Sequence, residues 1–232
     1  MSILIECRGL SKRYGSSTAL QDLNVTIGHG RIIGILGPNV SGKTTWIKLL
    51  NGILTPSAGE IRIEGERPGA LTHGIVSYLP DKNYLNRRMR VREVLDFFEA
   101  FYSDFRRNRA ERLLSELQID FHMPLRKMSK GTLEKVQLIL VMSRDAKLYI
   151  LDEPIAGVDP AARDYILNTI LKNYNPDATV LISTHLIADI EPVLDDVIFL
   201  KDGKIVLFAP VDVLREKEGK SVDELFREVF RC

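Results

Sequence analysis

The sequence predicts an α/β fold with a mainly parallel sheet, because segments of two kinds alternate along it. One kind is a short apolar run with little polar alternation, which is typical of a strand covered by helices on both faces. The other kind is a longer segment whose apolar residues recur at helical spacing, and strands that alternate with helices favour a parallel sheet. The apolar runs are 31–36, 75–79, 148–151 and 179–183, and the helical patterns are 44–50, 91–102, 109–117, 133–142 and 160–171.

Two parts of the chain depart from this alternation. Residues 1–30 and 60–64 alternate apolar with polar side chains, which predicts short strands in an N-terminal antiparallel β subdomain of about residues 1–30 and 58–72. The stretch from 83 to 142 is helical and charged and contains no apolar strand. We therefore expect an α-helical subdomain at 83–142, inserted into the core.

The predicted core occupies about residues 31–57, 73–82 and 143–200, and a C-terminal hairpin with helices occupies 197–232. The hairpin is expected because Asp202-Gly203 separates two apolar runs, and this dipeptide favours a tight turn. Two short helices should follow it. No long-period repeat is found, so residues 1–232 are predicted to form a single domain.

Composition limits the possible functions. Lysine and arginine total 32 against 31 acidic residues, so a net charge of +1 gives no reason to expect a nucleic-acid partner. The two cysteines, Cys7 and Cys232, match no metal-ligand spacing and no disulfide framework, which favours a reducing compartment. No uncharged apolar stretch approaches the roughly 18 residues of a membrane helix, and the N-terminus lacks the basic segment of a signal peptide. Any role at a membrane would be carried out from outside the bilayer.

Residues 37–44 read Gly-Pro-Asn-Val-Ser-Gly-Lys-Thr, which fits the pattern GxxxxGK[ST] between a buried strand and a helix. Such a loop needs glycines so that backbone N–H groups turn toward phosphates, a lysine to meet the β- and γ-oxygens, and a hydroxyl to ligate magnesium. The positive end of the following helix also faces the anion. The pattern alone would also suit an ordinary glycine-rich turn, but its position predicts a P-loop NTPase core.

Two adjacent carboxylates, Asp152 and Glu153, end the apolar run that starts at Leu148. Beside a phosphate loop, Asp152 can hold magnesium-bound water and Glu153 can polarise an attacking water. The alternative is a solvated loop that happens to contain two acids. Because the phosphate loop is present, we favour the first interpretation.

Three further segments narrow the prediction. Residues 128–132 read Met-Ser-Lys-Gly-Thr at the start of a helix, residues 154–159 read Pro-Ile-Ala-Gly-Val-Asp, and His185 follows the last buried run. With the phosphate loop and the paired acids, they resemble the ABC ATPase family over nearly the whole chain. There they stand in the places of the LSGGQ signature, the D-loop and the switch histidine.

The resemblance implies a shared nucleotide site. Two chains would associate head-to-tail, as a homodimer or as a heterodimer with a related ATPase, and Ser129 and Gly131 of one chain would cap the γ-phosphate on the other. It also implies that His185 contacts the γ-phosphate and holds the attacking water together with Glu153, and that Tyr14 stacks on adenine. Without the surrounding motifs, the serine would be a plain helix N-cap, the histidine a structural residue and the tyrosine a packing residue.

Several positions depart from the family pattern. Val40 stands where glycine is common, and a β-branched residue suits a positive φ poorly. Asp81 stands where a glutamine is usual, and aspartate can still hold a metal-bound water. Lys130 and Thr132 replace a glycine and a glutamine of the signature. A Ser-Lys-Gly signature with an acidic residue at position 81 resembles the subgroup that serves small exporters, including those for peptide antibiotics.

The predicted site residues fall into three sets. The catalytic residues are Glu153, His185 and Lys43. The ATP-binding residues are Tyr14, Gly37, Pro38, Asn39, Val40, Ser41, Gly42, Lys43, Thr44, Thr45, Ser129, Lys130, Gly131 and Asp159. The Mg²⁺ ligands are Thr44, Asp81 and Asp152.

The resemblance implies that the chain is the ATP-hydrolysing subunit of an ABC transporter, with ATP and Mg²⁺ as cofactors. It would power a separate transmembrane permease, with export favoured, from the cytoplasmic face of the cell membrane. The basic segment 81–92, with the helices beyond it, is the expected docking region, although a solvated charged face is an equal alternative for the segment. Two other functions stay open: a soluble non-transport ABC ATPase and a regulator that binds ATP without hydrolysing it.

Overall fold

The larger of two sheets is built from the apolar runs. The computed structural model describes residues 2–156 and 160–230, and the strand order in this sheet is β5-β6-β7-β3-β8-β9, with every neighbouring pair parallel except β8 and β9. The strands are β3 (Ile32–Leu36), β5 (Val76–Leu79), β6 (Leu148–Asp152), β7 (Thr179–Thr184), β8 (Asp196–Lys201) and β9 (Lys204–Pro210). The four predicted apolar runs are confirmed, each within one residue at either end.

The smaller sheet is antiparallel, in the order β2-β1-β4. Its strands are β1 (Ile3–Tyr14), β2 (Ser17–Gly28) and β4 (Ala58–Ile63). The expectation of short strands over the first 30 residues was wrong, since β1 and β2 have 12 residues each. Their pairing register shifts at several points, and Gly9 and Asp22 have φ values of 59° and 50°. Such bulges interrupt the two-residue alternation, which is why each long strand looks like fragments in the sequence.

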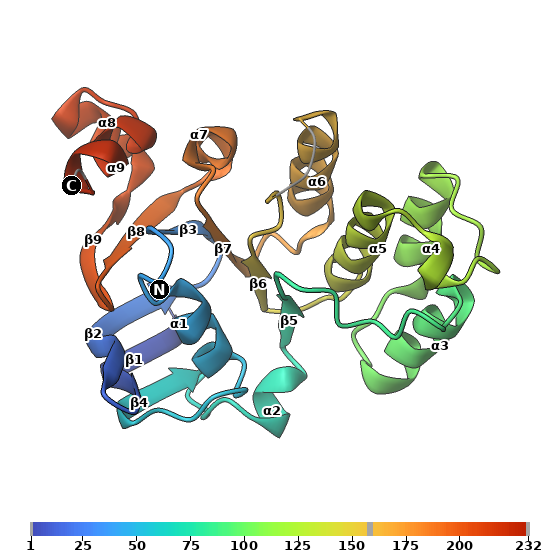
Figure 1. Cartoon of the computed structure of the whole chain (residues 1–232), viewed down its shortest axis with the longest axis horizontal. Coiled ribbons are helices and arrows are strands. Elements are labelled where there is room, and N and C mark those ends of the chain that lie inside the picture. The colour runs from blue at the N-terminus through green and yellow to red at the C-terminus, as the bar shows by residue number, and fades with distance from the viewer. Residues whose placement is uncertain (1, 157–159, 231–232) are drawn as a thin grey trace.

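Helices connect the strands, and the three that follow β5 gather at one end of the molecule, opposite α8 and α9 (Figure 1). The helices are α1 (Lys43–Leu50), α2 (Ala70–His73), α3 (Val91–Phe101), α4 (Arg107–Glu116), α5 (Lys130–Met142), α6 (Pro160–Asn173), α7 (Ile187–Ile190), α8 (Val211–Glu218) and α9 (Val222–Val229). Two short 3₁₀ turns lie at Leu125–Lys127 and Glu191–Val193. The five predicted helices and the two C-terminal ones are present, whereas α2 and α7 are too short to give a periodic signal.

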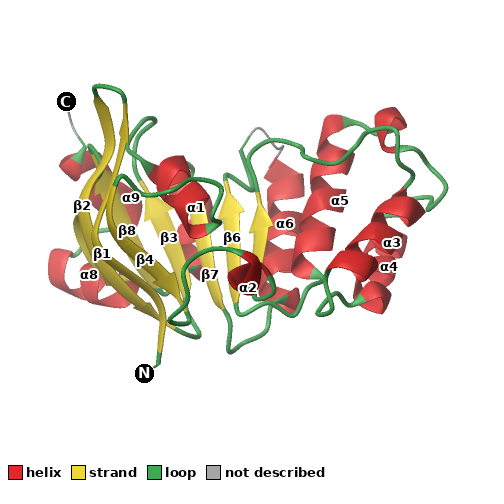
Figure 2. Ribbon diagram, turned by 90° about the horizontal axis from the view of Figure 1, so that it is seen from below, coloured by secondary structure: helices red, strands yellow, loops and turns green. Residues whose placement is uncertain are grey.

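The hydrophobic side chains form three clusters, and the central sheet separates two of them. Along β3, Ile33 and Ile35 face the cluster shared with the small sheet and α1, while Ile32 and Leu36 face the cluster shared with α5 and α6. A third cluster lies among α3, α4 and α5. Helix α5 contributes to two cores, because Ile139 packs in the third cluster and neighbouring residues pack against the sheet. Figure 2 shows the strands gathered toward one end and α3 and α4 at the other.

The predicted hairpin joins β8 to β9 and also supports the phosphate loop. Asp202 and Gly203 have φ values of 48° and 75°, which match the tight turn that Asp-Gly favours. The Gly203 N–H donates to the Ser41 carbonyl at 3.0 Å, and the Gly203 carbonyl accepts from the Gln21 N–H at 2.9 Å. A Cβ at Gly203 would lie 2.7 Å from the Ala19 carbonyl oxygen. Only glycine therefore allows the C-terminal hairpin to approach the loop this closely.

Val40, in the phosphate loop, has a φ of 70°. A β-branched residue in this left-handed region is strained by roughly 1–3 kcal/mol. The side chain offsets little of this cost by burial, since it is 99% exposed. The concern raised by the sequence about a positive φ at this position is therefore confirmed.

Replacing Val40 by glycine should stabilise the chain. The substitution relieves the left-handed strain but adds about 0.4–1 kcal/mol of unfolded-state entropy, so a net gain of about 1 kcal/mol is expected. For a chain of this size, that gain corresponds to a rise of about 2–4 °C in Tm. Thermal unfolding followed by circular dichroism measures it.

The control is Val206→Gly, because Val206 is half exposed on β9 and is not among the described residues with positive φ. There the same substitution should lower Tm, since glycine weakens a strand. A lower Tm for Val40→Gly as well would show that the loop does not strain valine.

Candidate functional site

The carboxyl ends of three neighbouring strands define the site. Strands β6, β7 and β3 are adjacent and parallel, so the residues that follow them lie on the same edge of the sheet. Gly37 follows β3, Glu153 follows β6 and His185 follows β7. Ligands of open α/β sheets bind at such an edge. Segments more than a hundred residues apart in the sequence therefore meet there.

The glycines of the phosphate loop are required by geometry. A Cβ at Gly37 would lie 2.4 Å from the Leu200 carbonyl oxygen and 2.5 Å from Ser41 Oγ. Gly42 has a φ of 110°, and its added Cβ would lie 2.6 Å from the Ala19 carbonyl oxygen. The loop is thus closed tightly against β8 and β2, and α1 begins directly after Gly42. Its backbone N–H groups and the helix N-terminus form a surface suited to an anion.

Lys43 is buried inside this loop. Its Nζ donates to the carbonyls of Gly37 at 2.7 Å and Pro38 at 3.1 Å. Burial lowers the pKa of Lys43, and the charges of Glu153 and Asp152 oppose that shift. The loop's own carbonyls therefore hold the ammonium group where it can meet a phosphate oxygen.

The two adjacent carboxylates have different surroundings. Asp152 is 2% exposed and accepts a hydrogen bond from Ser183 Oγ at 2.5 Å. Burial raises the pKa of Asp152, the hydrogen bond from Ser183 opposes the rise, and the charges of Asp81 and Glu153 add to it. Glu153 is partly exposed, has a φ of 53°, and its Oε2 lies 2.9 Å from His185 Nδ1. The structure thus joins two of the three predicted catalytic residues, Glu153 and His185, in one pair.

A pocket of about 510 Å³ opens over these groups. It is lined by Tyr14, Ser17, Thr18, Ala19, Asn39, Val40, Ser41, Gly42, Lys43, Thr44, Thr45, Asp81, Glu153, Ala156 and His185. Most of the predicted ATP-binding residues and all of the predicted catalytic ones are therefore brought together. Tyr14 is about half exposed at the end of β1, and Lys12 Nζ lies over its ring, 5.3 Å from the ring centre.

Some residues of the site were not predicted. Ser183 pairs in register with Asp152 in the neighbouring strand, and its backbone carbonyl also accepts from the Glu153 N–H at 3.0 Å. A serine inside a buried apolar strand was the available signal. Residues 17–19, at the start of β2, also line the pocket, but their approach is set by the small sheet and leaves no trace in the sequence.

The predicted signature residues lie apart from this pocket. Ser129 caps α5, with its Oγ accepting from the Thr132 N–H at 3.1 Å. Residues 129–131 are absent from the described lining of the pocket, and only Lys130 reaches an adjoining hollow of about 60 Å³. The N-cap interpretation is thus present in the structure, and the phosphate-capping interpretation requires another chain. Asp159, the predicted D-loop residue, lies outside the described residues.

The oxygen ligands near the loop fit a hard cation. Asp81 and Asp152 both line the small hollow, and Thr44 lines the main pocket. No group of three or more His, Cys, Asp or Glu side chains in the described ranges forms a complete metal cage. Mg²⁺ commonly takes one or two carboxylates and completes its shell with water and substrate phosphates. The residues present therefore fit magnesium bound together with a nucleotide.

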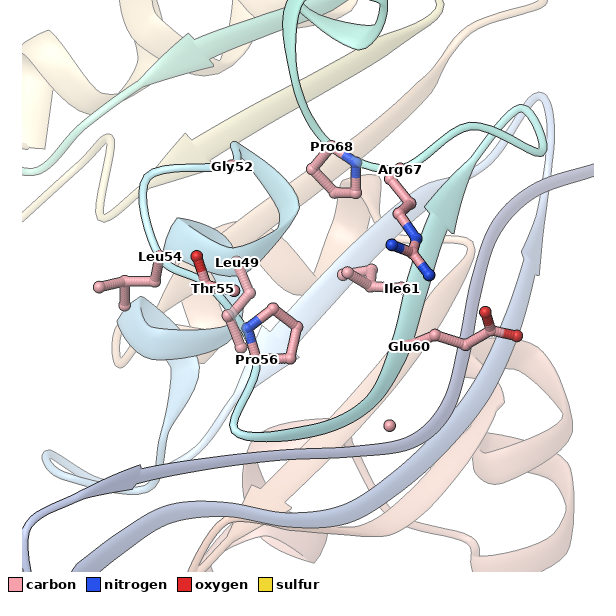
Figure 3. A pocket seen from close by; sticks show the side chains of 10 residues that line it. Leu49, Gly52, Leu54, Thr55, Pro56, Glu60, Ile61, Arg67 and Pro68 are labelled. Atoms are coloured by element: carbon pink, nitrogen blue, oxygen red, sulfur yellow. The ribbon is translucent and has the colours of Figure 1, made fainter.

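Other hollows lie away from these groups. The one in Figure 3, of about 280 Å³, lies between the end of α1 and β4 and contains none of the predicted site residues. Its charged lining residues are Glu60 and Arg67. A larger groove of about 630 Å³ runs from the end of α1 past β5 to α3.

None of the helices within residues 2–156 and 160–230 is both long and apolar enough to span a bilayer.

Comparison with known proteins agrees with this geometry. A family model described as ABC transporter matches residues 20–156. The chain is 31% identical over 216 residues to the SkfA peptide export ATP-binding protein SkfE of Bacillus subtilis, covering 89% of this chain and 90% of the relative. It is 29% identical to the Nod factor export ATP-binding protein I of Sinorhizobium fredii, covering 97% of this chain and 68% of the relative.

Solved structures with a similar fold include ATP-binding subunits of ABC transporters. The structure of an ATP binding subunit of an ABC transporter matches with a TM-score of 0.86 and 28% identity, covering 98% of this chain and 100% of that one. A dimeric post-hydrolysis cassette bound to ADP and Pi shares the fold, with a TM-score of 0.78 and 20% identity over 89% and 98% of the two chains. The family match includes the phosphate loop, Ser129 and the paired carboxylates, so the chain belongs to the ABC transporter family and is an ATP-binding, ATP-hydrolysing subunit.

Proposed function

We propose that the edge formed by β3, β6 and β7 hydrolyses ATP with Glu153 as general base, and that this drives export through a separate permease. The observation that carries the proposal is the pair of Glu153 and His185, 2.9 Å apart in the pocket that also contains Lys43. Residues 37–45 would hold the phosphates, and Tyr14 would stack on the adenine ring. Asp159, predicted from the sequence, would also contact ATP.

The roles of the catalytic side chains follow from their hydrogen bonds. With Glu153 ionised, His185 Nδ1–H donates to Oε2, which leaves Oε1 to accept a proton from the attacking water. The same tautomer leaves His185 Nε2 able to accept a hydrogen bond from that water. Lys43 would neutralise charge on the β- and γ-phosphates. Thr44, Asp152 and Asp81 would hold a magnesium ion, which would supply positive charge beside the phosphates.

The second half of the site would come from another chain. Ser129 and Lys130 are exposed at the start of α5, and Ser129 does not line the pocket of its own chain. A head-to-tail pair, whether a homodimer or a heterodimer with a related ATPase, would place each signature segment over the ATP of its partner. Closing that pair would be the mechanical step that ATP binding drives.

The groove of about 630 Å³ is the best docking surface for a permease. Tyr78, Tyr84, Phe98 and Tyr102 give it an aromatic lining, and its described lining contains Lys48, Lys82 and Arg144 but no aspartate or glutamate. This composition suits an amphipathic segment with an acidic end. Of the docking region expected from the sequence, residues 82–84 line the groove, while the arginines from 87 to 92 do not.

Export and location follow from the relatives and the partner. SkfE and Nod factor export protein I carry export in their names, and the resemblance of the signature points to the same subgroup. The chain would then sit on the cytoplasmic face of the cell membrane, held there by its permease. The permease would choose the cargo.

Glu153→Gln should abolish turnover while keeping ATP bound. The amide cannot accept the proton from water, so kcat should fall by at least about 10²-fold, whereas the Kd for ATP should change little because Lys43 and the loop are untouched. Steady-state phosphate release and calorimetric titration measure the two quantities. The control is Glu66→Gln, an exposed glutamate of the small subdomain. Tight binding without turnover in the unmodified chain, with its permease present, would favour a non-hydrolysing regulator instead.

Ser129→Ala should weaken ATP-dependent dimerisation beyond the cost of losing a helix cap. Loss of an N-cap serine costs about 1 kcal/mol, and loss of the contact to the partner's γ-phosphate adds to it. In the Glu153→Gln background with ATP, sedimentation should show that Ser129→Ala raises the Kd of the dimer by about tenfold or more.

Ser221→Ala is the matched control, because Ser221 caps α9 by accepting from the Glu224 N–H at 3.2 Å. It should lower stability similarly and leave the dimer intact. If Ser129→Ala and Ser221→Ala weaken dimerisation equally, Ser129 acts only as a helix cap.

A photoreactive benzoylphenylalanine at Tyr84 should cross-link to a membrane protein when the chain is purified from its native membrane. Tyr84 lines the groove and is about half exposed, so its ring is open to a docked segment. Val206, half exposed on β9, provides the control position. Cross-links to a membrane protein from position 206 alone would overturn the docking assignment.

A further inference from the structure

Arg144 is a buried charge at the joint between two parts of the chain. It lies two residues beyond the end of α5 and is 3% exposed. A guanidinium group is always charged and carries five N–H donors in a rigid plane. Burying it requires partners for those donors, and the structure supplies them from two separate segments.

The first set of partners belongs to the core. Arg144 donates to the carbonyls of Val76 at 2.6 Å, His73 at 3.1 Å and Gly74 at 3.1 Å. These carbonyls lie in the turn that joins α2 to β5. One side chain therefore ties this turn, at the start of an outer strand of the main sheet, to the end of α5.

The second set belongs to the connection between α3 and α4. Arg144 Nε lies 2.9 Å from Asp104 Oδ1, and a second guanidinium nitrogen lies 3.1 Å from Oδ2. The guanidinium also stacks over the Tyr102 ring, 3.8 Å from its centre. In addition, the Asp145 N–H donates to the Asp104 carbonyl at 3.0 Å. The helical subdomain is thus fastened to the same side chain that holds the core turn.

Arg144 also connects two functional surfaces. It lines the groove of about 630 Å³ together with Tyr102. Helix α5, which ends just before it, begins at the capping residue Ser129 and has 13 residues, so it spans about 20 Å. Because α5 packs into both the helical cluster and the sheet cluster, it is suited to transmit a change at one end to the other.

We propose that Arg144 is a positioning residue that sets the angle of the helical subdomain on the core and so couples the groove to the signature segment at Ser129. This inference rests on the proposed function, in which the groove receives the permease. Arg144 is absent from the lining of the main pocket and takes no part in the chemistry. A segment that docks against Arg144 and Tyr102 would disturb the contacts that hold the helical subdomain on the core. That disturbance would shift the N-terminal end of α5, at Ser129.

The chain without nucleotide provides a direct test. Spin labels on cysteines at Ser115, on α4, and Lys204, on β9, report the distance between the helical subdomain and the core, and both positions are exposed. Cys232→Ser removes the terminal thiol, and Cys7 is buried. Double electron–electron resonance should show one narrow distance distribution in the parent chain. Arg144→Lys, which keeps the charge but loses the planar fork, should broaden or split it.

Two further variants refine this measurement. Tyr102→Leu removes the stacking contact alone and should broaden the distribution less, which keeps the test usable if Arg144→Lys folds poorly. Arg31→Lys is the control, because Arg31 forms a comparable two-point ion pair with Asp196, at 2.6 and 2.7 Å, within the core, and it should leave the distribution unchanged. An unchanged distribution in folded Arg144→Lys would overturn the inference.

A second measurement separates positioning from simple structural support. In the Glu153→Gln background, Arg144→Lys should weaken ATP-dependent dimerisation by about tenfold, within the usual range of coupling between sites, and should leave the Kd of the monomer for ATP unchanged. Equal losses in monomer binding and dimerisation would show a general loss of structure and would also overturn the inference. If the parent chain fails to dimerise with ATP, the proposed shared site is wrong, and the label distances still decide the role of Arg144.

Discussion

The parallel alignment of β6, β7 and β3 is the constraint on which the site depends. Parallel neighbours place their carboxyl ends at one edge, so the phosphate loop, the paired carboxylates and the histidine meet without any local sequence signal that joins them. The strand register also positions Asp152. It pairs with Ser183 in the neighbouring strand and accepts a hydrogen bond from the Ser183 hydroxyl. A shift of one residue in that pairing would turn Ser183 to the other face of the sheet and leave a buried carboxylate without its donor.

The site holds several costly features, and close packing keeps them in place. Val40 and Glu153 have positive φ values, and Lys43 and Asp152 are charged groups inside the protein. Each would relax if its surroundings were loose. The hairpin turn at Gly203 bonds to the loop backbone, and β8 approaches Gly37 so closely that no side chain fits there. The C-terminal hairpin thus acts as a support for the phosphate loop at the other end of the sequence.

Helix α5 joins the helical subdomain to the core, because its side chains pack in both. It begins at the exposed Ser129 and ends near the buried Arg144, and its apolar side chains enter two different cores. A rigid helix shared between cores transfers displacement better than a loop does. The groove lined by aromatic residues lies at its C-terminal end, so the proposed permease contact and the proposed closure of the ATP site fall at opposite ends of one helix.

The sequence by itself determined the fold class, the buried strands, the helices longer than one turn and the phosphate loop, because each has a local pattern of period, glycine or charge. It also marked Val40 as a residue unsuited to its position, which the φ of 70° confirmed. It did not reveal that β1 and β2 are long, because bulges hide their period. The resemblance implied that Glu153 and His185 act together, and the structure places Oε2 of Glu153 2.9 Å from Nδ1 of His185. Only the tertiary structure pairs Asp152 with Ser183 and places Arg144 between the core and the helices. Those contacts join residues up to 71 positions apart. Strand order and helix packing decide whether such residues meet, and neighbouring residues in the sequence do not.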